Sequence, residues 1–225
     1  TKISNCVDET KRNSFIKNIF SYITRDRFDF GETVEGNYDF FSTIFEYLIQ
    51  NYNVASGTYA EYFTPQALSS AIGKILVHMA PIEDKIYEIY DPSAGSGSLV
   101  LHLANELGDG KFGNKARVYT QDISQKSSRF LRINMLLNGL KESLKNIVEG
   151  DTLTSPSHFK VEGDDNSGIK QFDFITSNPP FKTDFSSTRD KIEKNWENTA
   201  RFFAGVPKIP DKEKDKMGIY LCFIH

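Results

Sequence analysis

The sequence contains few cysteines, no long apolar run and no clear basic excess. Its two cysteines, Cys6 and Cys222, lie near opposite ends of the 225-residue chain. Cysteines this far apart in sequence suggest neither a disulfide framework nor a metal-ligand cluster, which suits a reducing compartment. No apolar run approaches the ~20 residues that a membrane-spanning helix needs. The N-terminus also lacks the basic-then-apolar order of a signal peptide, so we expect a cytoplasmic protein with no membrane partner.

The charge is nearly balanced, with 27 basic and 30 acidic residues and a formal net charge of −3. A DNA-binding protein that works alone usually carries a basic excess, because each phosphate contact needs a Lys or an Arg. We therefore do not expect this chain to bind DNA tightly by itself. Its four histidines, His78, His102, His158 and His225, show no metal-ligand spacing, so we expect no metal site.

The first quarter of the chain predicts a helical subdomain. Apolar residues recur at helical spacing from Phe15 to Ile23 and again from Phe41 to Ile49. The stretch between them, "DFGETVEGNYD", is typical of a loop. We expect residues 1–56 to form a small helical subdomain and residues 57–225 to form the catalytic domain. The aromatic stripes of the first part favour core or partner-facing surface over a cofactor site.

From Gly57 onward, segments with strand and helix patterns alternate. Thr64 is a good helix N-cap and Pro65 suits the first position of the helix that follows. Strands are predicted at 86–90, 116–120, 146–148 and 172–177, with helices at 99–107 and 126–137. This alternation predicts an α/β fold with a parallel, Rossmann-like sheet and helices on both faces. Because the chain stops in the helix-like stretch "GIYLCFIH", we expect the sheet to be incomplete at the C-terminus.

The stretch "YDPSAGSGSL", residues 90–99, follows a predicted strand and leads into a helix. Gly95 and Gly97 fall at the turn between them, where small residues let a ligand approach the backbone and helix amides favour negative charge. In a doubly wound sheet this is the edge at which ligands bind. The spacing lacks the third glycine of a dinucleotide site and the lysine of a phosphate loop. A tight structural turn explains this pattern about as well as a ligand site does.

One aspartate follows each of the next two strands. Asp122, in "TQDIS", stands where nucleotide-binding sheets place an acid on ribose hydroxyls. A simpler interpretation is that Asp122 caps the following helix. Asp151, in "EGDTL", is either a turn aspartate or an acceptor for an adenine amine. Taken alone, Asp122 is better explained as the start of the following helix, and a turn residue is the simpler explanation of Asp151.

The stretch "FDFITSNPPF", residues 172–181, ends a predicted buried strand in an amide, two prolines and an aromatic ring. The side-chain oxygen of Asn178 and the carbonyl of Pro179 could each accept one hydrogen of an exocyclic base amine, which would free the nitrogen lone pair. The prolines hold the backbone carbonyls still, and Phe181 could stack on the base. This is positioning and charge stabilisation rather than strong base catalysis. A capped strand end with a proline turn is the alternative, which we weigh less.

Together these motifs resemble the S-adenosylmethionine-dependent N6-adenine DNA methyltransferases, in particular the modification subunits of type I restriction–modification systems. The order supports the resemblance, because "FFSTIFEYLI" and "EYFTPQ" precede the glycine turn and "NPPF" follows it. The resemblance extends from about residue 38 to the end of the chain. It implies transfer of a methyl group from S-adenosyl-L-methionine to the N6 amine of an adenine flipped out of double-stranded DNA.

The resemblance also implies roles for individual residues. The segment 61–66 and the glycine turn with Asp91 would line the methionine end of the cofactor, Asp122 would hold its ribose and Asp151 its adenine amine. The implied cofactor-binding residues are Glu61, Tyr62, Phe63, Thr64, Pro65, Gln66, Asp91, Gly95, Ser96, Gly97, Ser98, Asp122 and Asp151. The implied catalytic residues are Asn178, Pro179, Pro180 and Phe181. Where relatives often have "DPACGTGGF", this chain has Ser98 for a glycine and Leu99 for an aromatic, which bears on the packing of the turn.

The partners that the resemblance implies are DNA, a specificity subunit that reads the sequence, a second modification subunit and, in the larger assembly, a restriction subunit. Two other hypotheses stay open. The first is a methyltransferase for another planar amine, in an RNA base or a protein glutamine; "EYFTPQ" and the helical N-terminus argue against it. The second is an inactive fragment that binds cofactor or serves assembly.

Overall fold

The computed structural model describes residues 64–108, 115–158, 168, 170–180 and 186–195, with single positions elsewhere. The chain divides into two compact units, Thr1–Asn37 and Tyr38–His225. All the longer described segments belong to the second unit. The helical subdomain expected at 1–56, and its boundary with 57–225, fall almost wholly outside the described residues and stay predictions.

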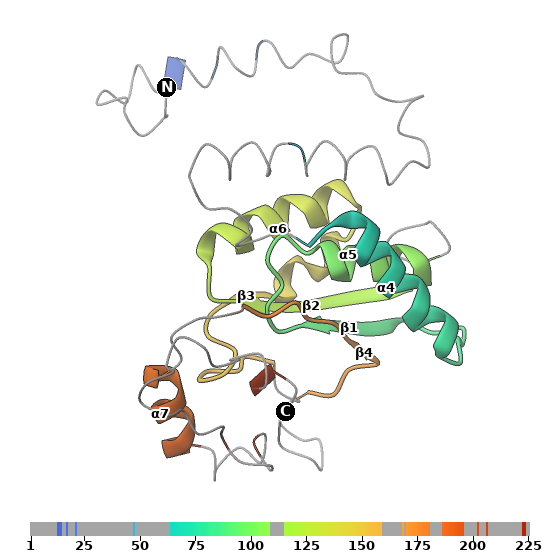
Figure 1. The fold of residues 1–225 in the computed structure, drawn as a ribbon. Coiled ribbons are helices and arrows are strands. Elements are labelled where there is room, and N and C mark those ends of the chain that lie inside the picture. Colours follow the sequence, from blue (N-terminus) through green and yellow to red (C-terminus); the bar gives the residue numbers. More distant parts are fainter. Residues whose placement is uncertain are drawn as a thin grey trace. The chain divides into compact units, whose positions relative to one another are not determined.

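The described part of the second unit alternates helices and strands in the predicted order (Figure 1). Its elements are α4 (Gln66–Met79), β1 (Tyr87–Asp91), α5 (Ser98–Leu107), β2 (Ala116–Asp122), α6 (Gln125–Leu137), the 3-10 helix η2 (Lys141–Asn146), β3 (Ile147–Glu149), β4 (Phe174–Ile175) and α7 (Ser186–Asn195). The four strands form one sheet in the order β3-β2-β1-β4, and each neighbouring pair is parallel. The predicted α/β, Rossmann-like fold is confirmed. Among the described segments, no helix is long and apolar enough to cross a membrane.

One face of the sheet is covered by helices. The chain steps from β1 to β2 to β3 in one direction, so right-handed crossovers place α5 and α6 on the same face. Figure 1 shows α4 gathered with α5 and α6 over this face. The core between these layers is apolar and buried, and it includes Ile89, Val100, Leu103, Val118, Leu131 and Met135.

The opposite face of the sheet carries aromatic side chains in the described residues. Tyr90 and Tyr119 alternate along their strands with the buried core positions, so they project from this second face. The ring of Tyr90 stacks on Phe172 with centroids 4.6 Å apart, and His158 meets Tyr119 edge-on at 5.4 Å. A small aromatic cluster therefore lies on this second face of the sheet.

Helix α4 begins one residue later than the capping pattern predicts. Pro65 takes the cap position, and its carbonyl accepts hydrogen bonds from the backbone amides of Leu68 and Ser69. The prediction that Thr64 caps this helix is therefore wrong. The Thr64 hydroxyl instead accepts a hydrogen bond from the side chain of Asn178, because the fold brings β4 to the start of α4.

Candidate functional site

The direction in which successive strands are added to the sheet reverses between β1 and β4. The first three strands run outward in one direction, whereas β4 joins the sheet on the other side of β1. In open α/β sheets, the loops at the carboxyl ends of strands diverge at such a point and leave a ligand-binding crevice. The glycine turn follows β1 and the Asn-Pro-Pro corner follows β4. The two most specific motifs therefore lie on either side of this position.

The glycine turn needs glycine for both backbone and packing reasons. Gly95 and Gly97 have φ angles of 54° and 88°, in the region that side chains disfavour. Gly97 also caps α5, and a methyl group there would clash with Leu131 Cδ1 of α6. Ser98 begins α5, half-buried, with its hydroxyl 3.4 Å from that of Ser96. The turn thus forms with Ser98 in place of the usual glycine.

Asp122 joins the end of β2 to the glycine turn. Its Oδ2 accepts a hydrogen bond from the backbone amide of Gly95 at 2.8 Å, and its Oδ1 accepts one from Ser124 at 2.8 Å. Ser124, and not Asp122, caps α6, so the simpler interpretation of Asp122 as a helix cap is wrong. Burial raises the pKa of Asp122, while the two backbone hydrogen bonds oppose that shift. Each carboxylate oxygen can still accept a second hydrogen bond.

Asp91 is the last residue of β1 and is buried. The residue is 1% exposed, and its Oδ1 accepts a hydrogen bond from the Ser93 amide at 2.9 Å. Burial raises the pKa of Asp91 to about 7, helped by the nearby charge of Asp122 and opposed by the Ser93 hydrogen bonds. At neutral pH the carboxyl group is therefore partly protonated, and its observed contact shapes the start of the glycine turn.

Asp151 forms a turn with its own neighbours after β3. Its Oδ1 accepts hydrogen bonds from the amides of Leu153 at 2.9 Å and Thr154 at 3.4 Å. The next residue ties the loop to the end of β1, because the Thr152 hydroxyl donates to the carbonyl of Pro92 over 2.6 Å. This geometry explains the aspartate as a turn residue and also holds it close to the carboxyl edge of the sheet.

Gln121 is a site-supporting residue that the sequence reasoning missed. Its fully buried amide donates from Nε2 to the Ser155 carbonyl at 2.8 Å and accepts at Oε1 from the Ser157 amide at 3.0 Å. Both ends of the amide therefore form hydrogen bonds with the backbone of the loop that begins with Asp151. The available signal was a polar residue inside a strand directly before Asp122, since a buried amide requires hydrogen-bonding partners.

The Asn-Pro-Pro corner is linked to two other elements. The exposed Asn178 donates from Nδ2 to the Thr64 hydroxyl at 3.2 Å, which connects it to the start of α4. The hydroxyl of Ser177 lies 2.7 Å from that of Ser93, just past the end of β1. Pro179 is half-buried and Pro180 is exposed. Phe181 and the segment Glu61, Tyr62 and Phe63 lie outside the described residues, so their predicted roles stay predictions.

Near this corner, two buried polar atoms have no hydrogen-bond partner among the residues that the structure describes. They are Nε2 of Gln66, in the first turn of α4, and Oγ1 of Thr176, two residues before Asn178. Buried donors and acceptors are almost always paired in folded proteins. An unpaired amide donor at this place fits an acceptor supplied by a bound molecule, such as a carboxylate.

Comparison with known proteins assigns these motifs to a family. The profile of the family described as N-6 DNA Methylase matches residues 36–225. The type I restriction enzyme MpnII methylase subunit of Mycoplasma pneumoniae is 28% identical over 209 residues, which are 92% of this chain and 36% of that protein. The MjaVII methylase subunit of Methanocaldococcus jannaschii is 23% identical over 156 residues, 69% of this chain and 24% of that protein.

A solved structure supports the fold. The methyltransferase subunit of a type I restriction–modification system from Streptococcus thermophilus superimposes with a TM-score of 0.53 at 20% identity. The superposition covers 73% of this chain and 31% of that one. The matched region is likewise only about a third of the length of the Mycoplasma relative and about a quarter of that of the Methanocaldococcus relative.

Proposed function

Because this chain belongs to the N-6 DNA methylase family, we propose that it is part of the modification subunit of a type I restriction–modification system. In this role it transfers a methyl group from S-adenosyl-L-methionine to the N6 amine of an adenine in DNA. The observation that carries the proposal is the Asn-Pro-Pro corner facing the glycine turn across the point where the strand order reverses.

The residues present fit S-adenosylmethionine, which would supply an electrophilic methyl group on a sulfonium. Asp122 can accept hydrogen bonds from ribose hydroxyls, and the glycine turn leaves backbone accessible where Gly95 and Gly97 have no side chains. The unpaired Gln66 Nε2 would donate to the carboxylate of the methionine end. Asp151 would accept from the adenine amine of the cofactor, and Thr64, Pro65, Ser96, Ser98 and Asp91 would complete the surrounding wall.

Asn178 is oriented to accept hydrogen bonds from the substrate. Its Nδ2 is already engaged by the Thr64 hydroxyl, so the opposite end of the amide presents Oδ1. In the proposed complex, Asn178 Oδ1 and the Pro179 carbonyl each accept one hydrogen of the adenine amine, which makes the nitrogen lone pair available. Such preorganised acceptors act mainly through positioning and charge stabilisation. Because Asn178 is exposed, the proton that the methylated nitrogen releases can pass to water.

The proposed substrate implies partners. An adenine amine cannot reach this corner inside a duplex, so the base must be flipped out. The net charge of −3 argues against extensive phosphate binding by this chain alone. We therefore propose that a specificity subunit and a second modification subunit supply most of the DNA contacts, with a restriction subunit in the larger assembly. The reaction would take place in the cytoplasm.

Transfer of a radiolabelled methyl group to DNA, measured with the specificity subunit present and absent, tests the proposal. We expect Asn178→Ala to abolish transfer while the affinity for S-adenosylmethionine, measured by titration calorimetry, stays near wild type. Gln171→Ala, an exposed change before β4, serves as the matched control and should keep full activity. Label transferred to RNA or to a glutamine peptide but not to DNA would favour another amine substrate. Cofactor binding without transfer to any of the three would indicate a fragment that serves assembly.

A further inference from the structure

Strand β4 is too short for its own backbone pairing to fix its register in the sheet. It contains two residues, Phe174 and Ile175, which pair with Ile89 and Tyr90 of β1. Strand register is well specified where a slip would exchange a buried apolar face for an exposed one. In β4 only Phe174 is a buried apolar residue, whereas Ile175 is 60% exposed. Other interactions must therefore fix the register of this strand.

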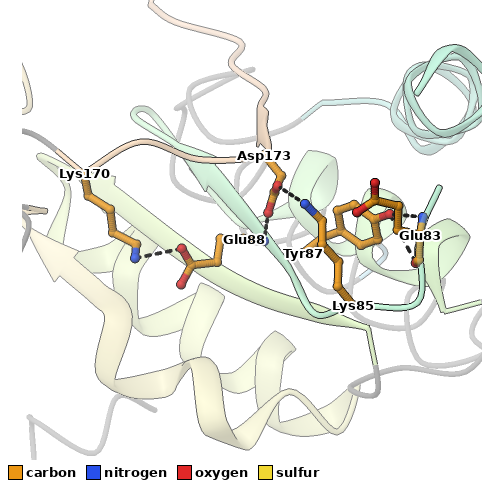
Figure 2. A network of polar contacts seen from close by, with 6 residues as sticks. All are labelled: Glu83, Lys85, Tyr87, Glu88, Lys170 and Asp173. Atoms are coloured by element: carbon orange, nitrogen blue, oxygen red, sulfur yellow. Dashed lines mark hydrogen bonds and ion pairs between the residues drawn. The ribbon is translucent and has the colours of Figure 1, made fainter. Parts of the chain in front are cut away.

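Asp173, directly before β4, makes three hydrogen bonds to β1 and to the residue Lys85 that precedes it, and Figure 2 shows the two that its side chain makes. Its Oδ1 accepts from Lys85 Nζ at 2.8 Å, and its Oδ2 accepts from the backbone amide of Glu88 at 2.8 Å. Its own backbone amide donates to the Glu88 carbonyl at 2.9 Å. Two of these bonds join Asp173 to one residue of β1, Glu88, and the third joins it to Lys85 just before that strand.

The side chain of Glu88 extends this attachment to the neighbouring strand. Its Oε2 lies 2.7 Å from Lys170 Nζ, and its Oε1 accepts a hydrogen bond from the Tyr119 hydroxyl of β2 at 2.8 Å. Figure 2 shows Lys170 and Lys85 approaching the pair formed by Glu88 and Asp173 from opposite sides. The approach to β4 is therefore anchored to both β1 and β2.

The carboxyl end of β4 carries contacts that depend on the same register. The amide of Thr176 donates to the Tyr90 carbonyl at 2.9 Å, and the Ser177 hydroxyl meets that of Ser93 at 2.7 Å. Asn178 follows directly. A slip by one residue would shift this segment by about 3.3 Å and turn each side chain to the opposite face of the sheet. It would remove Asn178 from Thr64.

We propose that Asp173 is a positioning residue that fixes the register of β4 against β1 and thereby places Asn178 for methyl transfer. The part that concerns methyl transfer rests on the proposed function, whereas the part that concerns register does not. The cofactor-binding residues of the proposal lie at or just before the start of α4 and at or after the ends of β1, β2 and β3, and none lies in β4. Loss of Asp173 should therefore impair transfer far more than cofactor binding.

A disulfide across the carboxyl ends of the two strands reports the register without any activity measurement. In the double variant Ser93→Cys/Ser177→Cys, the two sulfurs should join on treatment with diamide, since the parent hydroxyls are 2.7 Å apart. Peptide mapping by mass spectrometry distinguishes this bond from any that involves Cys6 or Cys222. We expect the yield to fall by roughly tenfold when Asp173→Ala is added, because disulfide formation requires close and correctly directed Cβ atoms.

Kinetics of the chain with its specificity subunit then test the link to catalysis. We expect Asp173→Ala to lower kcat by roughly 100-fold, the scale of a displacement of about 1 Å at a reacting centre. The affinity for S-adenosylmethionine should stay within about twofold, as for an independent site.

Two further variants are controls for this result. Asp173→Asn keeps an oxygen for the Glu88 amide, so it should lower kcat less than Asp173→Ala does. Asp84→Ala is the matched control, because Asp84 directly precedes Lys85 and forms only an exposed ion pair, of 3.4 Å, with Lys115. It should change neither disulfide yield nor rate.

The outcomes separate the two proposals. An unchanged disulfide yield in Asp173→Ala overturns the inference about register. An altered yield with kcat unchanged, or with kcat and cofactor affinity reduced equally, overturns the link to catalysis. If the wild-type protein with its specificity subunit transfers no methyl group to DNA, the proposed function fails while the disulfide measurement still decides the register. Should Asp173→Ala not fold, Asp173→Asn and Lys85→Met take its place in the same disulfide assay.

Discussion

Asp122 Oδ2 accepts a hydrogen bond from the backbone amide of Gly95 at a distance of 2.8 Å. This bond joins the end of β2 to the glycine turn that follows β1, across 27 residues of sequence. The residue proposed to hold the cofactor ribose therefore also supports the turn proposed to hold the methionine end. Any substitution at Asp122 acts on both parts of the site.

We predict that Asp122→Ala weakens the binding of S-adenosylmethionine by about 1–3 kcal/mol, the scale of a lost charge-assisted hydrogen bond. Titration calorimetry measures the change. Glu149→Ala is a suitable control, because this exposed residue pairs with Asp122 in the neighbouring strand and should leave affinity unchanged. Equal affinity for wild type and Asp122→Ala would remove Asp122 from the cofactor site.

We predict that Gly97→Ala lowers the free energy of unfolding by roughly 3 kcal/mol or more, because left-handed backbone strain adds to a clash with Leu131 in the core. Gly139→Ala isolates the first of these effects. Gly139 also has a positive φ, of 70°, but a methyl group there would have no atom within 4 Å. That change should cost only about 1–2 kcal/mol. Denaturant unfolding measures both, and equal costs would argue against the packing role of Gly97.

We predict that the carboxyl group of Asp91 titrates near its raised pKa of about 7, well above the ordinary value of 3.8. Between about pH 4 and pH 7, the Asp91 carboxyl group is therefore protonated in the folded protein and ionised in the unfolded chain. The contribution of Asp91 to stability is thus complete below about pH 4 and is lost as the pH rises through about 7. Carbon-13 NMR of the labelled carboxyl group measures the folded pKa directly. A midpoint near 4 would contradict the prediction.

We predict that Thr64→Val slows methyl transfer by roughly tenfold, because Asn178 loses the hydroxyl that orients its amide. Thr64→Ser keeps the hydroxyl and should restore most of the rate. The thermal midpoint should change little in either variant, since Pro65 holds the cap position of α4. A rate for Thr64→Val equal to that of wild type would show that Asn178 needs no support from this residue.

Local patterns were sufficient to predict most of the elements. The four strands, α5 and α6 were predicted within a few residues, and the motifs were placed correctly at the carboxyl ends of the strands. This succeeded because helix and strand periodicities and glycine turns are properties of neighbouring residues. The short extent of β4 was not predicted. Only two of the six residues in 172–177 pair with β1 as a strand. Asp173 and Thr176 on either side of them bond to β1 through single backbone amides.

Residue type and local order were enough to predict the α/β alternation, the glycine turn and the place of the Asn-Pro-Pro motif after β4. The tertiary structure alone decided which distant groups meet. Thr64 supports Asn178 instead of capping α4, Asp173 is tied to Lys85 and Glu88, and Gln121 holds the loop after Asp151. Such contacts depend on strand order and register, which are set by the packing of the whole sheet and leave no periodic signal along the chain.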